Sequence, residues 1–219
     1  MNAAPALPLA VIISGRGSNM VAIARACAAG QINARVARVI TDQPGAGGIA
    51  LARELGLEVS VVPARDHANR SAFEDALHTA IDTSGAKLVV LAGFMRILSP
   101  QFTQAYAGAL LNIHPSLLPL HPGLHTHERA LQAGDREHGA TVHYVISELD
   151  AGPRVLQARV PVLPGDTPAS LSARVQAQEH IIYPRVIGWI AAGRLRLEGG
   201  TVLFDGQALA EPLNLESGA

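Results

Sequence analysis

The chain has 219 residues, of which 48% are hydrophobic and 16% charged, enough for one sizeable core. Seventeen basic and eighteen acidic residues give a net charge of −1, so no overall basic character favours binding to nucleic acid or an anionic membrane. No apolar run reaches the roughly eighteen residues of a membrane span, and the single cysteine, Cys27, excludes an intrachain disulfide. We therefore expect a cytoplasmic protein.

The first half of the chain alternates predicted strands with predicted helices. Continuous apolar runs predict strands buried on both faces, and apolar residues at helical spacing predict helices. The predicted strands are 7–14, 34–41, 59–63, 87–93 and 110–113, and the predicted helices are 21–30, 45–56, 70–83 and 101–108. This alternation predicts an α/β fold with a mostly parallel, twisted sheet flanked by helices.

The pattern changes after Gly139. Segments 140–149 and 155–162 predict antiparallel strands toward one side of the sheet, followed by a long helix over 168–192. Pro184 is expected to kink or interrupt that helix. A small C-terminal hairpin and a loose tail from Glu211 complete the prediction, which treats residues 1–219 as a single domain.

The segment GRGSN (15–19) joins a predicted strand to a predicted helix. Backbone N–H groups at a helix N-terminus can bind an anion, and a single phosphate fits this loop best. Met20 stands where a dinucleotide fingerprint needs its third glycine, and the loop lacks the Gly-Lys-Ser/Thr of a P-loop. An ordinary tight turn with a helix cap is an equally good interpretation of the motif alone.

Asn112 and His114 occupy the end of the strand at 110–113, in the segment NIHP. Residues two apart on a strand point to the same face, so the amide and the imidazole project together. Such a pair can donate hydrogen bonds to an anionic oxygen, provided that an acid lies near the imidazole. Asp150 in the turn ELDAGP is one candidate for that acid, but spacing alone does not select it over Glu148.

The histidines of this region also suggest a metal site. The residues concerned are His121, His125, His127, His138 and His143. Their spacing lacks the i, i+4 pair of a helical zinc site, and no cysteine is near enough to complete a structural one. We therefore predict no metal.

Five segments in this order resemble the phosphoribosylglycinamide formyltransferase family. They are GRGSN, VVLAGFMRILSP, LLNIHPSLLPLHPGLHTH, HGATVHYVISELDAGP and RVQAQEHIIYP, and the likeness extends from about residue 9 to residue 206. The resemblance implies a Rossmann-like formyltransferase fold and a role in purine biosynthesis and one-carbon metabolism. The reaction implied is attack by the amine of N1-(5-phospho-D-ribosyl)glycinamide on the formyl carbon of 10-formyltetrahydrofolate, a co-substrate.

The resemblance also implies the roles of individual residues. The catalytic residues would be Asn112, His114 and Asp150. The residues that bind the phosphoribosyl substrate would be Gly17, Ser18, Asn19, Gln176 and Glu179. The residues that bind folate would be Arg70, Met95, Arg96, Ile97, Leu98, Asn112, Val145 and Asp150. The implied partners are small molecules only, with no nucleic acid and no membrane, for a monomer or homodimer.

The sequence departs from the family pattern at three places. Arg16 lies between the glycines of the phosphate loop, Leu120–His121 replaces a Lys–aromatic pair, and Ala151 stands where a second glycine often occurs. The alternatives are hydrolysis of 10-formyltetrahydrofolate, a tRNA formyltransferase, a non-catalytic ligand-binding protein and a histidine-cluster metal hydrolase. The tRNA enzyme would need a basic C-terminal domain, for which we find too few residues after the long helix.

Overall fold

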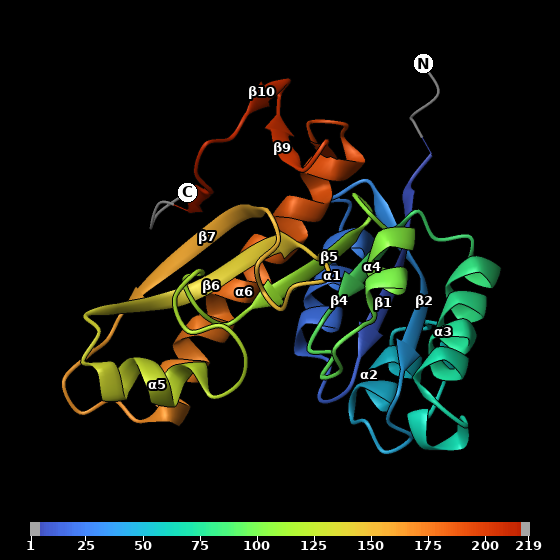
Figure 1. Cartoon of the computed structure of the whole chain (residues 1–219), viewed down its shortest axis with the longest axis horizontal. Helices are drawn as coiled ribbons and strands as arrows, with labels where there is room; N and C mark the ends of the chain where they lie inside the picture. The colour runs from blue at the N-terminus through green and yellow to red at the C-terminus, as the bar shows by residue number, and fades with distance from the viewer. Residues whose placement is uncertain (1–4, 216–219) are drawn as a thin grey trace. The chain divides into compact units, whose positions relative to one another are not determined.

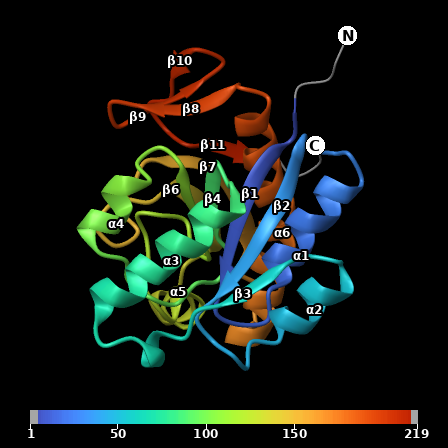
Figure 2. The same ribbon diagram turned by 90° about the vertical axis from the view of Figure 1, so that its right-hand side faces the viewer.

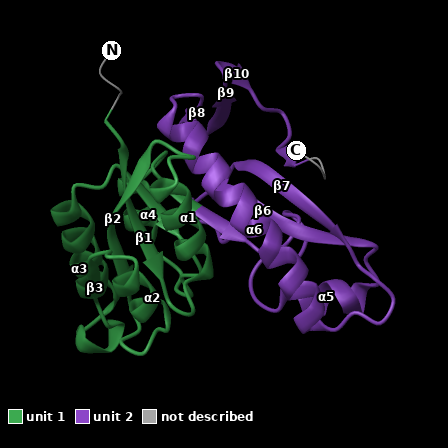
Figure 3. Ribbon diagram, turned by 180° about the vertical axis from the view of Figure 1, so that it is seen from behind, with its two compact units in different colours: residues 1–111 green, residues 112–219 purple. Residues whose placement is uncertain are grey.

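The structure is a computed structural model that describes residues 5–215. The chain divides into two compact units, Met1–Leu111 and Asn112–Ala219, which Figure 3 colours separately. Strand β5 (Leu110–His114) begins in the first unit and ends in the second. We describe each unit by itself, and the single domain over residues 1–219 stays a prediction.

The first unit alternates strands and helices as predicted. Its strands are β1 (Leu7–Ile13), β2 (Ala34–Thr41), β3 (Val59–Val61) and β4 (Leu88–Leu91). Its helices are α1 (Ser18–Ala28), α2 (Gly48–Glu54), α3 (Arg70–Ser84) and α4 (Pro100–Ala105), with a short 3-10 helix at Ala64–Asp66. The strand order is β4-β1-β2-β3, and every pair is parallel (Figure 2).

Burial on both faces explains why the strands of the first unit could be identified from sequence. Residues 9–13 of β1 have no exposed surface at all, and β4 is buried along its whole length. Side chains with branched β-carbons fill such positions well, and parallel strands require both faces to be covered. Helix α3 starts where the side chain of Asn69 accepts a hydrogen bond from the N–H of Ala72, and it ends at Gly85 in the left-handed conformation.

The second unit combines an antiparallel pair with a long helix (Figure 1). Its main strands are β6 (Glu137–Tyr144), β7 (Arg154–Pro161) and β11 (Leu213–Leu215), in the order β11-β7-β6. Its helices are α5 (Thr126–Ala133) and α6 (Pro168–Ala191). A small antiparallel sheet contains β8 (Leu195–Glu198), β9 (Thr201–Phe204) and β10 (Gln207–Ala208). The antiparallel pair and the C-terminal hairpin are confirmed.

Four details differ from the sequence prediction. Strand β6 ends at Tyr144, so residues 145–149 form a loop and not a continuation of the strand. Helix α6 runs through Pro184 without interruption, because the buried apolar ring offsets the loss of one backbone hydrogen bond. Leu213–Leu215 is not a loose tail, since it pairs in parallel with β7 and covers a strand edge. Helix α5 was not predicted.

Within residues 5–215, no helix is both long enough and apolar enough to cross a membrane.

Candidate active site

The imidazole of His114, at the end of β5, lies between two acceptors and is only 7% exposed. Its Nδ1 atom is 3.4 Å from a carboxylate oxygen of Asp150, and its Nε2 atom is 3.0 Å from the backbone carbonyl of His121. A neutral imidazole has only one N–H and would face one of these acceptors with a lone pair. A ring that carries hydrogens on both nitrogens would satisfy both contacts and would place a positively charged donor beside a carboxylate.

Asp150 is held in a strained loop between β6 and β7. Its backbone has a φ of 53°, in the left-handed region that aspartate tolerates better than most residues. The carboxylate accepts a hydrogen bond of 2.8 Å from the N–H of Gly123. Two residues later, a Cβ atom at Gly152 would lie 1.8 Å from the carbonyl oxygen of Tyr144, so the close approach of the loop to β6 requires glycine there.

His143 links Asn112 to this pair and was not assigned a catalytic role from the sequence. Its Nδ1 atom lies 2.9 Å from the carbonyl of Tyr144, an acceptor, so Nδ1 carries the hydrogen. Burial lowers the pKa of His143 to about 4 and keeps the ring neutral near pH 7, so Nε2 is an acceptor. The side-chain nitrogen of Asn112, 3.2 Å away, donates to it, which fixes the orientation of the Asn112 amide.

The remaining contacts of His143 place Asn112, His114 and Asp150 in one group. The Nε2 atom of His143 is 3.9 Å from the other carboxylate oxygen of Asp150. A register irregularity between β6 and β7 falls at Val142 and His143, and such bulges often re-aim side chains beside active sites. In the sequence, strand alternation bears on the direction of the His143 side chain but does not identify the partner of that side chain.

The loop after β5 is fixed by side chains of β6 and β7, of which Thr141 and Gln157 are buried. The hydroxyl of Thr141 donates to the carbonyl of Ser116 at 2.7 Å and accepts from the N–H of Leu118 at 3.1 Å. Gln157 and Arg154 each donate to the carbonyl of Leu118 at 2.8 Å. These bonds explain how an irregular loop presents the His121 carbonyl to His114 in a defined position.

The other four histidines that suggested a metal site contact single side chains instead of converging on one point. His121 lies 2.6 Å from Asp135, His125 lies 3.3 Å from Glu128, and His127 shares a contact of 3.1 Å with His138. Burial lowers the pKa of His138 to about 4, and the pKa of His127 is also lowered, mainly by burial. Among residues 5–215, no group of three or more His, Cys, Asp or Glu side chains is placed to hold a metal ion.

The phosphate-loop residues predicted from the sequence lie between β1 and α1 in the first unit. Gly17, at the start of the helix, has a φ of 76°, and a Cβ atom there would lie 3.0 Å from the Cα atom of Gly48. No side chain caps α1, and Ser18 and Asn19 form its first turn. A helix N-terminus with a glycine at its cap leaves room for an anion against the backbone N–H groups.

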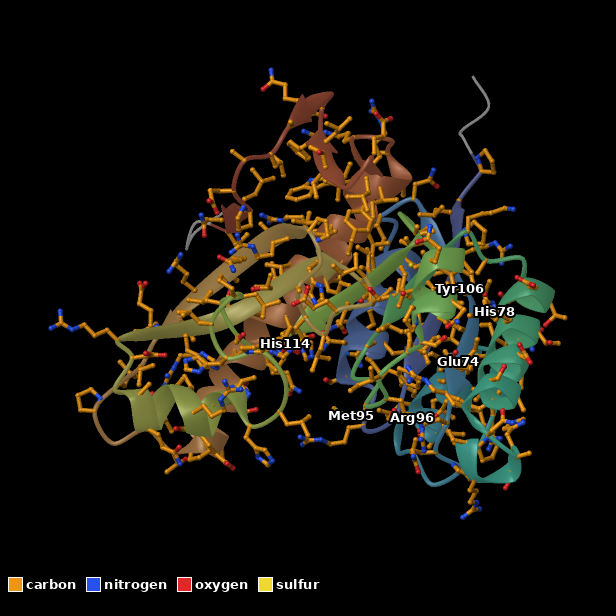
Figure 4. All side chains as sticks on the ribbon, in the orientation of Figure 1. Glu74, His78, Met95, Arg96, Tyr106 and His114 are labelled. Carbon is orange, nitrogen blue, oxygen red and sulfur yellow. The ribbon has the colours of Figure 1, made fainter. Side chains whose placement is uncertain are left out.

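The predicted folate residues of the first unit are Arg70 and the segment Met95–Leu98, of which Figure 4 labels Met95 and Arg96. Arg70, at the start of α3, donates a hydrogen bond of 2.7 Å to the carbonyl of Ile97. Arg96 forms an ion pair of 2.7 Å with Asp42. Met95 and Ile97 are 71% and 63% exposed, whereas Leu98 is buried.

The predicted residues of the second unit outside the Asp150 group lie on two elements. Gln176 and Glu179 are three residues apart on α6, and Glu179 is buried. Val145 is half-buried and directly follows β6, in the loop that carries Asp150.

The chemistry available in the second unit is donation to an anionic oxygen together with proton transfer. Asn112 has an amide nitrogen whose orientation is fixed, and His114 has a ring that faces a carboxylate. Buried donors of fixed orientation stabilise a developing negative charge more strongly than water does, because they need not reorganise. The adjacent carboxylate can take or return a proton.

Comparison with known proteins places this arrangement in a family context. Residues 7–187 match the formyl transferase family. The chain is 50% identical to the phosphoribosylglycinamide formyltransferase of Escherichia coli K12 over 92% of this chain and 95% of that one. It is 45% identical to the enzyme of the same name from Haemophilus influenzae over 92% of this chain and 95% of that one. The solved structure of the Coxiella burnetii phosphoribosylglycinamide formyltransferase, 45% identical, superposes with a TM-score of 0.91 over 95% of this chain and 99% of that one.

Proposed function

The chain belongs to the formyl transferase family, in the group of the phosphoribosylglycinamide formyltransferases, and from this we propose its reaction and the roles of its residues. It transfers the formyl group of 10-formyltetrahydrofolate to the amine of N1-(5-phospho-D-ribosyl)glycinamide, a step of de novo purine (IMP) biosynthesis. The products are the N-formyl compound and tetrahydrofolate. The observation that carries the proposal is the group of Asn112, His114 and Asp150, of which His114 is buried, in a chain that matches such enzymes over nearly their whole length.

The reaction begins with direct attack of the amine on the formyl carbon. A formyl amide is a weak electrophile, so the tetrahedral intermediate needs donors for its oxyanion and a path for the amine proton to N10 of the folate. Asn112 and protonated His114 supply the donors, and the carboxylate of Asp150 lies 3.4 Å from the ring, where it can offset the positive charge. Asp150 also accepts and returns the proton, directly or through water. The scheme uses no covalent enzyme intermediate and calls for no metal, since these side chains supply the charge.

One contact of His114 must change during this reaction. In the structure Nε2 lies 3.0 Å from the carbonyl of His121 and Nδ1 lies 3.4 Å from Asp150, so both N–H groups of a protonated ring would already face an acceptor. To donate to the oxyanion, the Nε2 hydrogen is shared with the carbonyl of His121 or released from it. Catalytic hydrogen bonds often take their final geometry only in the substrate complex, and this is the change that the contact predicts.

The binding roles follow the same assignment. Residues Gly17, Ser18 and Asn19 hold the phosphate of the phosphoribosyl substrate at the start of α1, and Gln176 and Glu179 on α6 contact the same substrate. Folate is bound by Arg70, Met95, Arg96, Ile97, Leu98 and Val145, with Asn112 and Asp150 at its reactive end. The exposed side chains of Met95 and Ile97 supply the apolar surface that a flat pterin requires.

The partners that we propose are the two small-molecule substrates, for a cytoplasmic monomer or homodimer that binds neither nucleic acid nor membrane. The net charge of −1 supports the proposal that the protein does not bind polyanions. The proposed role in purine biosynthesis supports the cytoplasmic location.

An assay of 10-formyltetrahydrofolate conversion, with and without the phosphoribosylglycinamide substrate and with and without a chelator, tests the function. We expect turnover that depends strictly on the amine and is unaffected by the chelator. Formate release without the amine would support the hydrolase instead, and loss of turnover in chelator would remove the metal-free mechanism.

The variant His114→Ala tests the assignment of the donor. We expect kcat to fall by about three orders of magnitude or more, as for removal of an oxyanion donor, while the KM of each substrate changes little. Steady-state kinetics on the purified variant, with circular dichroism to verify folding, measure this. Near-normal kcat would exclude His114 from the mechanism.

A further inference from the structure

The segment Met95–Leu98 is held in place by side chains and not by regular secondary structure. It connects β4 to α4 and belongs to neither a strand nor a helix. Its two most exposed side chains, Met95 and Ile97, are apolar. Exposed apolar side chains on a segment with a fixed backbone are typical of a ligand contact. The contacts that fix this segment therefore bear on how tightly the ligand binds.

Asp42, just beyond β2, holds one end of the segment. Its carboxylate accepts hydrogen bonds from the hydroxyl of Ser14 at 2.6 Å, from Nε of Arg96 at 2.7 Å and from the side chain of Gln43 at 2.8 Å. The hydroxyl oxygen of Ser14 accepts a hydrogen bond of 3.0 Å from the backbone N–H of Met95. Asp42 thus fixes the side chain of Arg96 directly and the backbone of Met95 through Ser14.

Glu74, on α3, holds the other end. It accepts hydrogen bonds from the backbone N–H of Ser99 at 2.7 Å and from the Ser99 hydroxyl, and it pairs with Arg70 at 3.0 Å. Arg70 in turn donates to the carbonyl of Ile97. Ser99 also caps α4 by accepting from the N–H of Phe102, so Glu74 supports a helix as well as the segment. Figure 4 labels Glu74 together with Met95 and Arg96.

Asp42, unlike Glu74, has side-chain contacts mainly with the segment Met95–Leu98 and with the serine that holds it. Asp42 is 3% exposed, and apart from the adjacent Gln43 its side chain bonds to Arg96 and to the hydroxyl that holds Met95. A buried carboxylate with three donors forms strong, charge-assisted bonds of defined geometry. The guanidinium of Arg96 also lies over the ring of Phe73, with its Cζ atom 5.5 Å from the ring centroid. Together these contacts leave the Arg96 side chain little freedom.

We propose that Asp42 is a positioning residue for folate, which acts through Ser14 and Arg96 by holding Met95–Leu98 in the conformation that binds the pterin. The proposal rests on the proposed function, because it requires that this segment contacts folate. Asp42 itself touches neither substrate. Its loss raises the free energy of the binding conformation and weakens folate binding, without changing the donors that act on the formyl group.

The test compares Asp42→Ala and Asp42→Asn with the wild-type enzyme in steady-state kinetics. Loss of one charge-assisted network predicts a rise of about tenfold in the KM for 10-formyltetrahydrofolate in Asp42→Ala. The kcat and the KM for the phosphoribosylglycinamide substrate should stay within about twofold. Asp42→Asn keeps one acceptor oxygen, so it should recover part of the folate affinity. Calorimetric titration with tetrahydrofolate gives the dissociation constant independently of turnover.

Asp166→Ala is the matched control. The carboxylate of Asp166 pairs with Arg174 at 2.8 Å, so this substitution removes a partly buried ion pair in the second unit, away from the segment Met95–Leu98 in sequence. It should lower the melting temperature and leave both KM values unchanged. If Asp42→Ala fails to fold, Ser14→Ala removes the link between Asp42 and Met95 and should also raise the folate KM.

The outcomes separate this proposal from the proposed function. Wild-type enzyme that neither binds tetrahydrofolate nor transfers the formyl group would overturn the function itself. Active wild-type enzyme whose folate KM is unchanged in Asp42→Ala and in Ser14→Ala would overturn only the positioning role. Changes of both KM values and kcat by equal factors would overturn the positioning role as well, because that pattern indicates a general structural defect.

Discussion

The hydrogen bonds of His143 fix the orientation of the Asn112 amide, for which we propose a catalytic role. His143 must carry its hydrogen on Nδ1, because that atom faces the carbonyl of Tyr144 at 2.9 Å. Its low pKa, about 4 as a result of burial, leaves Nε2 as an acceptor at neutral pH. The nitrogen of the Asn112 amide must then face His143, and its second hydrogen is available in one direction only. In our scheme the ring of His143 does not touch the substrate, but it orients the amide of Asn112, which does.

We therefore predict that His143→Ala lowers kcat by about tenfold to hundredfold, less than the loss of a complete oxyanion donor. The physical reason is that Asn112 loses the acceptor that orients it. Substrate KM values should change little. His143→Gln can present a carbonyl oxygen to the same amide and should recover part of the activity. Steady-state kinetics of the two variants measure the effect.

A double-mutant cycle is the control for that prediction. If His143 acts through Asn112, the variant that carries both Asn112→Ala and His143→Ala should be no slower than Asn112→Ala alone. Additive losses would show that His143 has a separate role, such as holding Asp150, whose carboxylate is 3.9 Å from its ring.

At the scale of elements, the loop between β6 and β7 depends on one glycine. A methyl group at Gly152 would overlap the carbonyl of Tyr144, at 1.8 Å, where two backbones approach each other. The backbone must move to relieve this overlap, and Asp150 moves with it, away from His114 and from its bond to Gly123.

We predict that Gly152→Ala lowers kcat by about a hundredfold, because a displacement of about 1 Å at a catalytic group has an effect of this size. It should also destabilise the fold by roughly 1–3 kcal/mol through strain. Kinetics and urea unfolding measure the two effects. Ala151→Gly, in the same loop, is the matched control and should leave kcat within about threefold. Equal kinetics in the two variants would contradict the requirement for glycine.

The same elements show what a sequence can predict and what it cannot. The strands of the first unit were predictable because burial on both faces leaves a continuous apolar run, as in β1 and β4. Leu213–Leu215 could not be identified, since three residues carry too little pattern and the pairing partner, β7, lies far away in sequence. Likewise, two-residue spacing places Asn112 and His114 on the same face of a strand. The choice between Asp150 and Glu148 as the acid depends on the loop geometry, which spacing does not give. Family resemblance, not spacing, selected Asp150.

At the scale of the whole molecule, buried neutral histidines link stability to pH. Burial lowers the pKa of His138 and of His143 from 6.5 to about 4, and it lowers the pKa of His127 as well. In the unfolded chain these rings titrate near 6.5. Between about pH 6.5 and pH 4 the unfolded chain therefore binds more protons than the folded protein. The free energy of unfolding is thus at its full value above pH 6.5 and declines as the pH falls through this window.

We predict that the urea midpoint of the wild-type protein is constant from pH 8 to pH 7 and falls steadily from pH 6.5 to pH 5. His138→Gln removes one of the rings that the folded protein keeps neutral. Between pH 6.5 and pH 5 the free energy of unfolding of this variant should therefore fall by about 1 kcal/mol less than that of the wild type. The interval ends at pH 5 because ordinary carboxylates titrate below it and would add their own slope. A wild-type midpoint that does not change between pH 7 and pH 5 would mean that the rings gain no protons on unfolding, and the buried histidines would then have no part in stability.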